Sequence, residues 1–342
     1  MRRPLRIAQI APVAAAVRVG EGDSIEQLVG LLCEELVRRG HDVTLYATGD
    51  SVTSARLRSL RAHGYDDDDD AWDWQFSESV HAAEAFAHTA EHDVIHAHDL
   101  HFALPFARLV DVPVIETQHV ECSPEVRAAQ RRCERLHLVA ASEYQRDLLG
   151  GGSDITVISH GIDVTAFAFS AQTGDYLLFL GRMLPDKGPL DAVAVARAAG
   201  MPIVIAGPAV EGHEQMLDAV LGGERVHHAG AVDHATRNTL LAGAAALVFP
   251  VTYPEPFGLV MVEAMASGTP VLATALGAVA EIVDSGLTGY TAPTWEGLAE
   301  LVPAALELDR RAIRTRALER FDARRMADDY EALYYRVAGA SA

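Results

Sequence analysis

Lysine is almost absent from this sequence. Of its 28 lysine and arginine residues, Lys187 is the single lysine, so the other 27 are arginine. A bias of this kind usually reflects the coding background of a genome, so it excludes no function by itself. The one position that escapes the bias is different, because a compact ammonium group makes a point contact with phosphate that a planar guanidinium does not. Lys187 is therefore a candidate functional residue.

Positive charge is scarce, and its scarcity limits the partners of the protein. The chain has 48 aspartate and glutamate residues against 28 basic ones, which gives a formal net charge of −20. So acidic a surface repels nucleic-acid backbones and anionic lipids, which argues against nucleic-acid binding and against docking through a basic membrane patch. Cysteine is scarce as well. The three cysteines have no C-x-x-C spacing and cannot all pair within the chain, which indicates a reducing cytoplasm.

Long hydrophobic runs are missing too. No segment approaches the roughly 18 consecutive apolar residues that a membrane span needs. The amino terminus has the basic start and mildly apolar stretch of a signal peptide, but Arg18 and the acidic segment 21–23 interrupt it. We therefore expect a cytoplasmic protein without a stable membrane anchor. Its 342 residues, 49% of them hydrophobic, suffice for two domains with cores of their own.

What the sequence does have is a repeated alternation of strands and helices. A strand over 6–10 leads through a glycine-containing loop to a helix that begins at Ser24. Further strands of the first half are expected at 43–47, 94–96, 114–117, 138–140 and 155–158. The second half restarts the pattern with strands at 176–180, 203–206, 225–228, 247–249 and 271–273. This alternation predicts the α/β class, with two facing Rossmann-like domains, parallel sheets and a hinge near residues 160–172.

The expected ligand site is the cleft between the two domains, because ligands of open α/β sheets bind outside the carboxyl ends of the strands. The loop after strand 176–180 holds Arg182 and Lys187 between two glycines, and a helix is expected to begin near Pro189. Two cations beside a helix amino terminus make an anion site. A strongly acidic protein needs such a positive island to bind a diphosphate. The alternative interpretation is a surface loop with two solvated cations.

Two carboxylates lie around the next such loop. Glu255 follows strand 247–249, and Glu263 is expected about two turns into the following helix. Carboxylates accept hydrogen bonds from hydroxyls, so the pair suits a ligand with two sets of vicinal diols, such as a sugar joined to a ribose through phosphate. In the alternative interpretation both are ordinary helix charges. Glu263, however, is next to the buried helix face, where an idle charge is costly.

Weaker candidates come from the first half. Gly20 and Gly22 could bring backbone amides close to a phosphate, but the third glycine of a dinucleotide fingerprint is missing. His119 follows strand 114–117 and could bond a hydroxyl or steady developing charge, although a structural role fits equally well among 15 histidines. The acidic row 66–70 resembles a metal-binding Asp-x-Asp motif, but no apolar strand precedes it, so we expect a solvated loop. No histidine or cysteine spacing predicts a metal site.

The chain resembles the retaining nucleotide-sugar glycosyltransferases of family 4, which have the GT-B fold. The resemblance rests on Gly181-Arg182-x4-Lys187-Gly188 and on Glu255-x7-Glu263 within EPFGLVMVEAMASGTPVLA. Other matching segments are Ile95-His96-Ala97-His98-Asp99, Ser142-Glu143, His160-Gly161-Ile162-Asp163 and Gly277-x3-Glu281. The resemblance implies an acceptor-side domain over 1–163, a donor-side domain over 164–320, and a helix over 321–342 that crosses back to the first domain.

The resemblance also implies a role for each site residue. Arg182 and Lys187 would neutralise the donor diphosphate, Glu255 would hold the hydroxyls of the transferred sugar, and His119 would face that sugar. The remaining donor contacts would come from Glu263, at the ribose hydroxyls, from the backbone amides of Phe257, Gly258 and Leu259, and from Gly20 and Gly22 near the diphosphate. Family members commonly have adjacent glycines where this chain has Gly20-Glu21-Gly22, a departure that puts the last of these contacts in doubt.

For the whole chain, the resemblance implies a retaining transferase that uses a nucleotide diphosphate sugar, with UDP as the expected nucleotide, and needs no metal or other cofactor. Few basic residues cluster in the acceptor-side domain, so we expect a soluble small-molecule or oligosaccharide acceptor, in antibiotic or other secondary-metabolite biosynthesis. Two alternatives stay open. One is a phosphorylase of the same fold whose pyridoxal phosphate is bound by the single lysine. The other is a catalytically silent protein that only binds the nucleotide.

Overall fold

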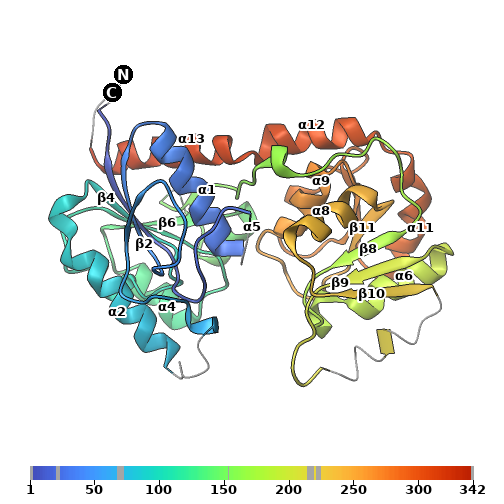
Figure 1. The fold of residues 1–342 in the computed structure, drawn as a ribbon, viewed down its shortest axis with the longest axis horizontal. Helices are drawn as coiled ribbons and strands as arrows, with labels where there is room; N and C mark the ends of the chain where they lie inside the picture. The colour runs from blue at the N-terminus through green and yellow to red at the C-terminus, as the bar shows by residue number, and fades with distance from the viewer. Residues whose placement is uncertain are drawn as a thin grey trace. The chain divides into compact units, whose positions relative to one another are not determined.

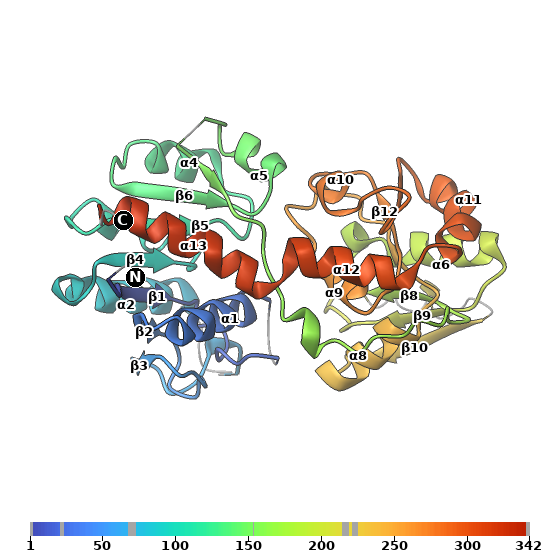
Figure 2. The same ribbon diagram turned by 90° about the horizontal axis from the view of Figure 1, so that it is seen from above.

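A computed structural model describes residues 3–20, 24–67, 73–152, 154–213, 219–220 and 225–339. The chain divides into two compact units. Unit 1 comprises residues 1–161 together with the carboxyl-terminal segment 323–342, and unit 2 comprises the continuous segment 162–322. Figures 1 and 2 show the elements of each unit in two views. Each unit has its own parallel sheet covered by helices on both faces, which confirms the predicted α/β class.

The sheet of unit 1 has seven parallel strands in the order β3-β2-β1-β4-β5-β6-β7 among the described residues. Their bounds are β1 Arg6–Ile10, β2 Asp42–Tyr46, β3 Arg56–Arg58, β4 Val94–Ala97, β5 Val114–Thr117, β6 Leu136–Ala140 and β7 Thr156–Val157. The direction of the strand order changes between β1 and β4. At such a switch point the loops from neighbouring strands diverge to opposite faces, so a crevice opens at the carboxyl edge of the sheet.

The helices of unit 1 bury one side against this sheet. They are α1 Ser24–Arg38, α2 Trp74–Ala87, α3 Leu104–Ala107, α4 Pro124–Gln130, α5 Glu143–Leu148 and α13 Ala323–Val337. In α1 the buried residues include Leu28, Leu32 and Leu36, the helical spacing that predicted the element. Helices α1 and α13 lie on one face and α2 on the opposite face (Figure 1), and α13 passes across the sheet (Figure 2). The last helix of the chain is thus part of the first unit.

The sheet of unit 2 has six parallel strands in the order β10-β9-β8-β11-β12-β13 among the described residues. Their bounds are β8 Leu177–Leu180, β9 Ile203–Ala206, β10 Val226–Gly230, β11 Ala246–Phe249, β12 Val271–Thr274 and β13 Gly289–Ala292. The switch point lies between β8 and β11. Almost every residue of the central strands is buried, as a sheet covered on both faces requires.

Two layers of helices cover the sheet of unit 2. The bounds are α6 Pro189–Ala199, α8 His234–Gly243, α9 Leu259–Ala266, α10 Val279–Ile282, α11 Trp295–Leu306 and α12 Arg310–Phe321. Helices α6 and α11 pack on each other and on the sheet, where their apolar residues join those of β8, β9 and β11 in one core. Helix α9 packs against β11 and β12 and also against α8 and α12, which together form the other layer.

A buried arginine fastens α12 to the rest of unit 2. Arg310 is 4% exposed. Its guanidinium donates to the carbonyl oxygens of Ser170 at 2.8 Å, Ala244 at 2.9 Å and Ala242 at 3.0 Å, and to Thr269 Oγ1 at 2.7 Å. Burial lowers the pKa of Arg310. Because these acceptors satisfy the buried guanidinium, the contact acts as a structural anchor rather than as a ligand site.

The structure adds two strands that the sequence analysis did not predict. β3 is a three-residue edge strand with half-buried or exposed side chains, so it lacks the apolar run of an interior strand. β13 contains a glycine and two partly exposed residues. An added Cβ at Gly289 would lie 2.0 Å from the carbonyl oxygen of Val271, so the close approach of β12 and β13 requires glycine there. The formation of both strands therefore depends more on pairing with the neighbouring strand than on an apolar pattern in their own sequence.

Candidate functional site

Three loops converge at the carboxyl edge of unit 2, around the switch point. They are the loop 181–188 after β8, the loop 250–258 after β11 and the loop 275–278 after β12. The amide of Thr252 donates to the carbonyl oxygen of Asp186 at 2.9 Å, and the amide of Ala278 donates to that of Glu255 at 2.8 Å. These bonds tie the loops together, and the switch point is where an open α/β sheet binds its ligands.

Two glycines allow this convergence. Gly188 has φ +73°, and a Cβ there would lie 2.2 Å from the carbonyl oxygen of Pro250. Gly277 has φ +67°, and a Cβ there would lie 2.4 Å from the carbonyl oxygen of Glu255. Both positions combine a left-handed backbone with a contact that no side chain fits, so only glycine serves. The two glycines therefore let the loops that carry Lys187 and Glu255 approach their neighbours closely.

Lys187 and Glu255 meet in a cluster with Tyr253. The Nζ atom of Lys187 lies 3.3 Å from Oε2 of Glu255 and donates a hydrogen bond to the hydroxyl of Tyr253, which in turn donates to the same carboxylate oxygen. The ammonium also lies 4.5 Å from the centroid of the tyrosine ring. Burial and the Glu255 carboxylate raise the pKa of Tyr253, so its hydroxyl stays protonated and donates. Tyr253 was not predicted, although it lies only two residues before Glu255 on the same loop.

Arg182 lies at the start of the same loop and is exposed. Its positive charge lowers the pKa of Tyr253, whereas burial and the Glu255 carboxylate raise that pKa by more. The guanidinium therefore lies near the cluster. Among the residues that the structure describes, none forms a hydrogen bond or ion pair with the guanidinium of Arg182. Lys187 is paired and Arg182 is not, so Arg182 presents the more available positive charge to an entering anion.

Glu263 lies one turn into α9 rather than two, because the helix begins only at Leu259. Its side chain is buried, with 8% of the residue exposed, and burial raises its pKa. The Nη1 atom of Arg237, on α8, lies 3.4 Å from Oε1 of Glu263 and opposes that shift. Arg237 was not predicted, because its helix is separated from α9 by a strand and a loop. The carboxylate is thus held in place with an ion-pair partner.

The amino end of α9 offers backbone donors beside these side chains. Gly258, the residue just before the helix, has φ +84°, a left-handed value that favours glycine. In the described part of the chain, the amides of Gly258 and Leu259 donate no backbone hydrogen bond. Phe257 is buried and packs edge-on against Phe321 at 5.9 Å, which anchors the turn. Free amides at a helix amino terminus attract anions.

His119 lies in unit 1, directly after β5, within a stack of imidazoles. Its ring stacks on those of His98 and His160, each with a centroid distance of 5.2 Å. Burial lowers the pKa of His119 to about 4 and lowers those of His98 and His160 well below the usual value. All three rings are therefore neutral near pH 7, and His119 acts through hydrogen bonds rather than through charge.

A chain of hydrogen bonds connects His119 with α13. His119 Nε2 lies 3.0 Å from His98 Nδ1, and His98 Nε2 lies 3.1 Å from Gln9 Oε1 on β1. Gln9 donates to the hydroxyl of Tyr334 at 2.9 Å, and that hydroxyl lies 2.7 Å from His96 Nδ1. The chain ends with His96 Nε2, Thr117 Oγ1 and the Tyr330 hydroxyl, spaced 2.7 and 2.8 Å apart. Sequence alone gave no signal for it, because it joins residues from both ends of the chain.

The remaining sequence candidates are Gly20, Gly22 and the acidic row 66–70. Gly20 has φ +82°, and an added Cβ would meet open space. Gly22 lies outside the described residues, as does the acidic segment 68–70. Asp66 is exposed, as expected of a solvated loop. Within the described ranges, no group of three or more histidine, cysteine, aspartate or glutamate side chains is arranged to hold a metal ion.

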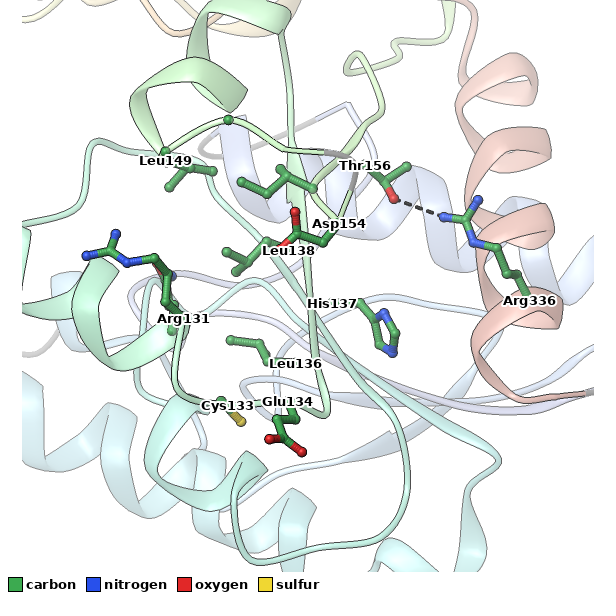
Figure 3. A pocket seen from close by; sticks show the side chains of 14 residues that line it. Arg131, Cys133, Glu134, Leu136, His137, Leu138, Leu149, Asp154, Thr156 and Arg336 are labelled. Atoms are coloured by element: carbon green, nitrogen blue, oxygen red, sulfur yellow. Dashed lines mark hydrogen bonds between the residues drawn. The ribbon is translucent and has the colours of Figure 1, made fainter.

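A cavity of about 720 Å³ lies elsewhere in unit 1, beside β6 and β7. Figure 3 shows its lining, where Arg336 on α13 donates to Thr156 Oγ1 at 2.9 Å. The lining includes Arg131, Glu134 and Asp154, so charges of both signs are present. None of the predicted site residues that the structure describes lines this cavity. Its chemistry therefore points to no particular ligand.

Comparison with known proteins gives two family matches. Residues 166–320 match the family described as Glycosyl transferases group 1, and residues 25–166 match the family described as Glycosyltransferase Family 4. The first match contains the Lys187, Tyr253 and Glu255 cluster together with Glu263, and the second contains His98 and His119. The two matches cover the sheet of unit 2 and, except for β1, the sheet of unit 1.

Individual proteins give consistent similarities. The chain is 34% identical to a glycogen synthase of Mycobacterium tuberculosis, over 67% of this chain and 65% of that protein, so it spans just under two thirds of the relative's length. It is 29% identical to a phosphatidyl-myo-inositol mannosyltransferase of the same species, over 73% and 75% of the two chains. Among solved structures it is similar to AviGT4, a glycosyltransferase involved in avilamycin A biosynthesis, with a TM-score of 0.76, 26% identity and 99% of each chain covered. In the described part of the chain, no helix has the length and apolar character needed to cross a membrane.

Proposed function

The chain is a GT-B glycosyltransferase with a group 1 domain and a family 4 domain, and from this premise we propose that it transfers a sugar from a nucleotide diphosphate sugar to a small-molecule or oligosaccharide acceptor. The observation that carries the proposal is the meeting of Lys187, Tyr253 and Glu255 beside Arg182 and the free amides of α9. Positive charge, backbone donors and a carboxylate within one site suit a ligand that combines phosphates with hydroxyls.

The donor diphosphate binds to Arg182, Lys187 and the amides at the start of α9. Arg182 is exposed and without an ion-pair partner among the described residues, so it meets the phosphates first. Lys187 is already paired with Glu255 at 3.3 Å. A phosphate that reaches the ammonium therefore competes with the carboxylate, and this competition releases Glu255 to accept hydrogen bonds from the sugar. Glu263, which Arg237 holds in place, accepts hydrogen bonds from the ribose hydroxyls.

The reaction needs charge stabilisation at the leaving phosphate. As the bond between the sugar and the phosphate breaks, negative charge grows on the phosphate oxygens, and the two cations stabilise it more than they stabilise the bound donor. We infer a metal-independent reaction with retention of the anomeric configuration, in which the leaving phosphate accepts the proton of the acceptor hydroxyl. Glu255 then serves as a binding group, since its carboxylate is engaged with Lys187 and Tyr253. His119 bonds a hydroxyl of the transferred sugar as a neutral imidazole.

In this proposal the nucleotide of the donor is UDP. The acceptor is a secondary metabolite, such as an oligosaccharide antibiotic. The acceptor class draws support from the similarity to AviGT4 over 99% of each chain. The net charge of −20 also favours a neutral or cationic acceptor over an anionic lipid. The mycobacterial relatives, named as a glycogen synthase and a mannosyltransferase, indicate that the same fold serves several acceptors.

The test is a thermal-shift titration of UDP, GDP, ADP and dTDP against the wild type and two variants. Lys187→Ala removes the ammonium, and Arg197→Ala removes an exposed cation of α6 outside the site and serves as the matched control. We expect one nucleotide to raise the melting temperature of the wild type and of Arg197→Ala but not that of Lys187→Ala. Hydrolysis of the matching nucleotide sugar then shows catalysis. Binding without hydrolysis or transfer to any acceptor would point to a silent nucleotide-binding protein, and pyridoxal absorbance of the purified protein to a phosphorylase.

A further inference from the structure

The hydrogen-bond chain between α13 and His119 has a direction, and the amide of Gln9 sets it. We propose that Gln9 is a positioning residue: acting through His98, it holds His119 in the Nε2–H tautomer, so that His119 offers an unprotonated Nδ1 to a substrate hydroxyl. The tautomer is a property of the free protein, and only the contact with a substrate hydroxyl rests on the proposed function.

The direction follows from the two different ends of the Gln9 amide. Its Oε1 faces His98 Nε2 at 3.1 Å, and an amide oxygen only accepts, so His98 Nε2 carries the proton. A neutral imidazole has a single N–H, so His98 Nδ1 is an acceptor. His119 Nε2, 3.0 Å away, must then be the donor. The one proton of a neutral His119 is thereby used, and its Nδ1 keeps a free lone pair.

The hydrogen bonds at the other end of the Gln9 amide agree with this direction of donation. Gln9 Nε2 donates to the hydroxyl of Tyr334 at 2.9 Å. The Tyr334 hydroxyl then donates to His96 Nδ1 at 2.7 Å, and His96 Nε2–H donates to Thr117 Oγ1 at 2.7 Å. Every donor thus faces an acceptor from β1 to β5. Reversing the order would require the amide to turn over while three rings exchange their protons together.

The surroundings of His119 keep the ring neutral and fix its plane, so the tautomer is the property that matters. The ring lies between those of His98 and His160, with interplanar angles of 29° and 22°. Protonating one ring of such a buried stack is costly, and burial lowers the pKa of each of the three. Among the described residues, none forms a hydrogen bond with Nδ1 of His119. The acceptor nitrogen is therefore available to a ligand.

The chemical consequence is a preference for a hydroxyl donor. A neutral Nδ1 acceptor bonds an O–H group of a sugar, and it has no bond to offer a deoxy or O-methyl group at the same position. Loss of one neutral hydrogen bond to a ligand reduces kcat/KM by about tenfold. The opposite tautomer would instead offer an N–H, which bonds ether and hydroxyl oxygens alike. Gln9, although remote from the substrate, thus contributes to the choice of sugar.

The direct test is a ¹⁵N–¹H correlation spectrum of histidine side chains in the full-length, ligand-free protein labelled with [¹⁵N]histidine. His119→Asn assigns the resonances of His119. We expect a single Nε2–H tautomer for both His119 and His98. A single Nδ1–H tautomer, or a mixture of the two, at His119 in the wild type overturns the proposal.

The second test replaces Gln9 with methionine, which keeps the length of the side chain but has no amide. Gln145→Met is the matched control, because Gln145 is also a buried glutamine of unit 1 and bonds the amide of Ala141, outside the histidine chain. We expect Gln9→Met to give a mixture of tautomers at His119, and Gln145→Met to give the wild-type spectrum. An unchanged single tautomer in a folded Gln9→Met protein overturns the positioning role. If Gln9→Met does not fold, the wild-type spectrum still decides the tautomer.

Activity separates this proposal from the proposed function. If half of the molecules have the wrong tautomer, kcat/KM for sugar transfer or donor hydrolysis falls about twofold, and by up to about tenfold if that tautomer predominates. If the wild type has the Nε2–H tautomer but handles no nucleotide sugar, the transferase proposal fails and the tautomer assignment stands. If transfer occurs and Gln9→Met retains the full wild-type kcat/KM with a mixed tautomer, the role of Gln9 in catalysis fails instead.

Discussion

The ammonium of Lys187 and the carboxylate of Glu255 lie 3.3 Å apart, joined a second time through the hydroxyl of Tyr253. Both side chains are largely buried, with 20% and 13% exposed. The positive charge of the candidate phosphate site is therefore partly compensated before any ligand arrives. A phosphate can therefore bond the ammonium of Lys187 only if it displaces the Glu255 carboxylate or shares the ammonium with it.

Glu255→Gln is expected to separate nucleotide binding from sugar transfer. The amide no longer competes for the ammonium, so the affinity for the nucleoside diphosphate rises, by about tenfold at most for a partly buried pair. Transfer falls by about 10- to 100-fold, because the sugar loses a charged hydrogen-bond partner. Calorimetric titration of the diphosphate and steady-state kinetics with the nucleotide sugar measure the two effects. The exposed Glu300→Gln on α11 is the control, and weaker diphosphate binding by Glu255→Gln would contradict the competition.

Tyr253→Phe is expected to lower the rate of transfer without loosening the fold. The phenylalanine ring keeps the contact with the ammonium, seen at 4.5 Å, but the hydroxyl link to Glu255 is lost. One hydrogen bond from a neutral hydroxyl to a charged group contributes about 1 to 2 kcal/mol, so kcat/KM falls by about 5- to 30-fold. Kinetics and a melting curve check this, with Tyr290→Phe on β13 as the control. An unchanged kcat/KM would show that Lys187 and Glu255 hold their positions without the hydroxyl.

Asp99 is expected to make stability depend on pH. It is fully buried after β4, and its Oδ2 finds no hydrogen-bond partner among the described residues. Burial, and secondarily the charge of Glu116, raises the pKa of Asp99 from 3.8 to about 8. A carboxyl whose folded-state pKa is raised favours the fold while protonated, so its contribution is lost as the pH rises from about 4 to about 8, by about 1.4 kcal/mol per pH unit.

Comparison of Asp99→Asn with the wild type isolates this effect, because other titrating groups cancel in the difference. Between pH 5 and pH 8, the free energy of unfolding of Asp99→Asn should rise steadily relative to that of the wild type, and the difference should level off above about pH 9. Urea unfolding at several pH values measures it. A difference that does not change with pH would mean that Asp99 ionises normally in the fold.

Arg310→Met is expected to destabilise unit 2. The substitution leaves the carbonyl oxygens of Ser170, Ala242 and Ala244 without their buried donor. Each buried acceptor left without a donor costs about 1 kcal/mol or more, so the three carbonyl oxygens together cost about 3 kcal/mol. Thermal unfolding checks the loss against Arg197→Met, which removes an exposed arginine from α6. Equal melting temperatures for the two variants would exclude the anchoring role.

The sequence predicted the parts of this protein that local patterns determine. Apolar strands such as 203–206 and the switch-point loop with Lys187 follow from residues close together in the chain, and the structure has them there. It could not predict Arg237 beside Glu263 or Tyr334 beside Gln9. Those contacts join residues 26 and 325 positions apart, and only the packing of whole elements creates them. Glu263 lies one turn into α9 rather than the expected two, because the helix begins only after Gly258.

Unit 1 receives its last helix from the far end of the chain, since α13 follows the whole of unit 2. On the ribosome, the continuous segment 162–322 therefore emerges in full before Tyr330 and Tyr334 become available to the first sheet. Until translation nears its end, His96 of β4 and Thr117 of β5 lack these phenols, and the sheet face that α13 crosses is covered only in part, by α1. The half that is synthesised first is thus the half that matures last.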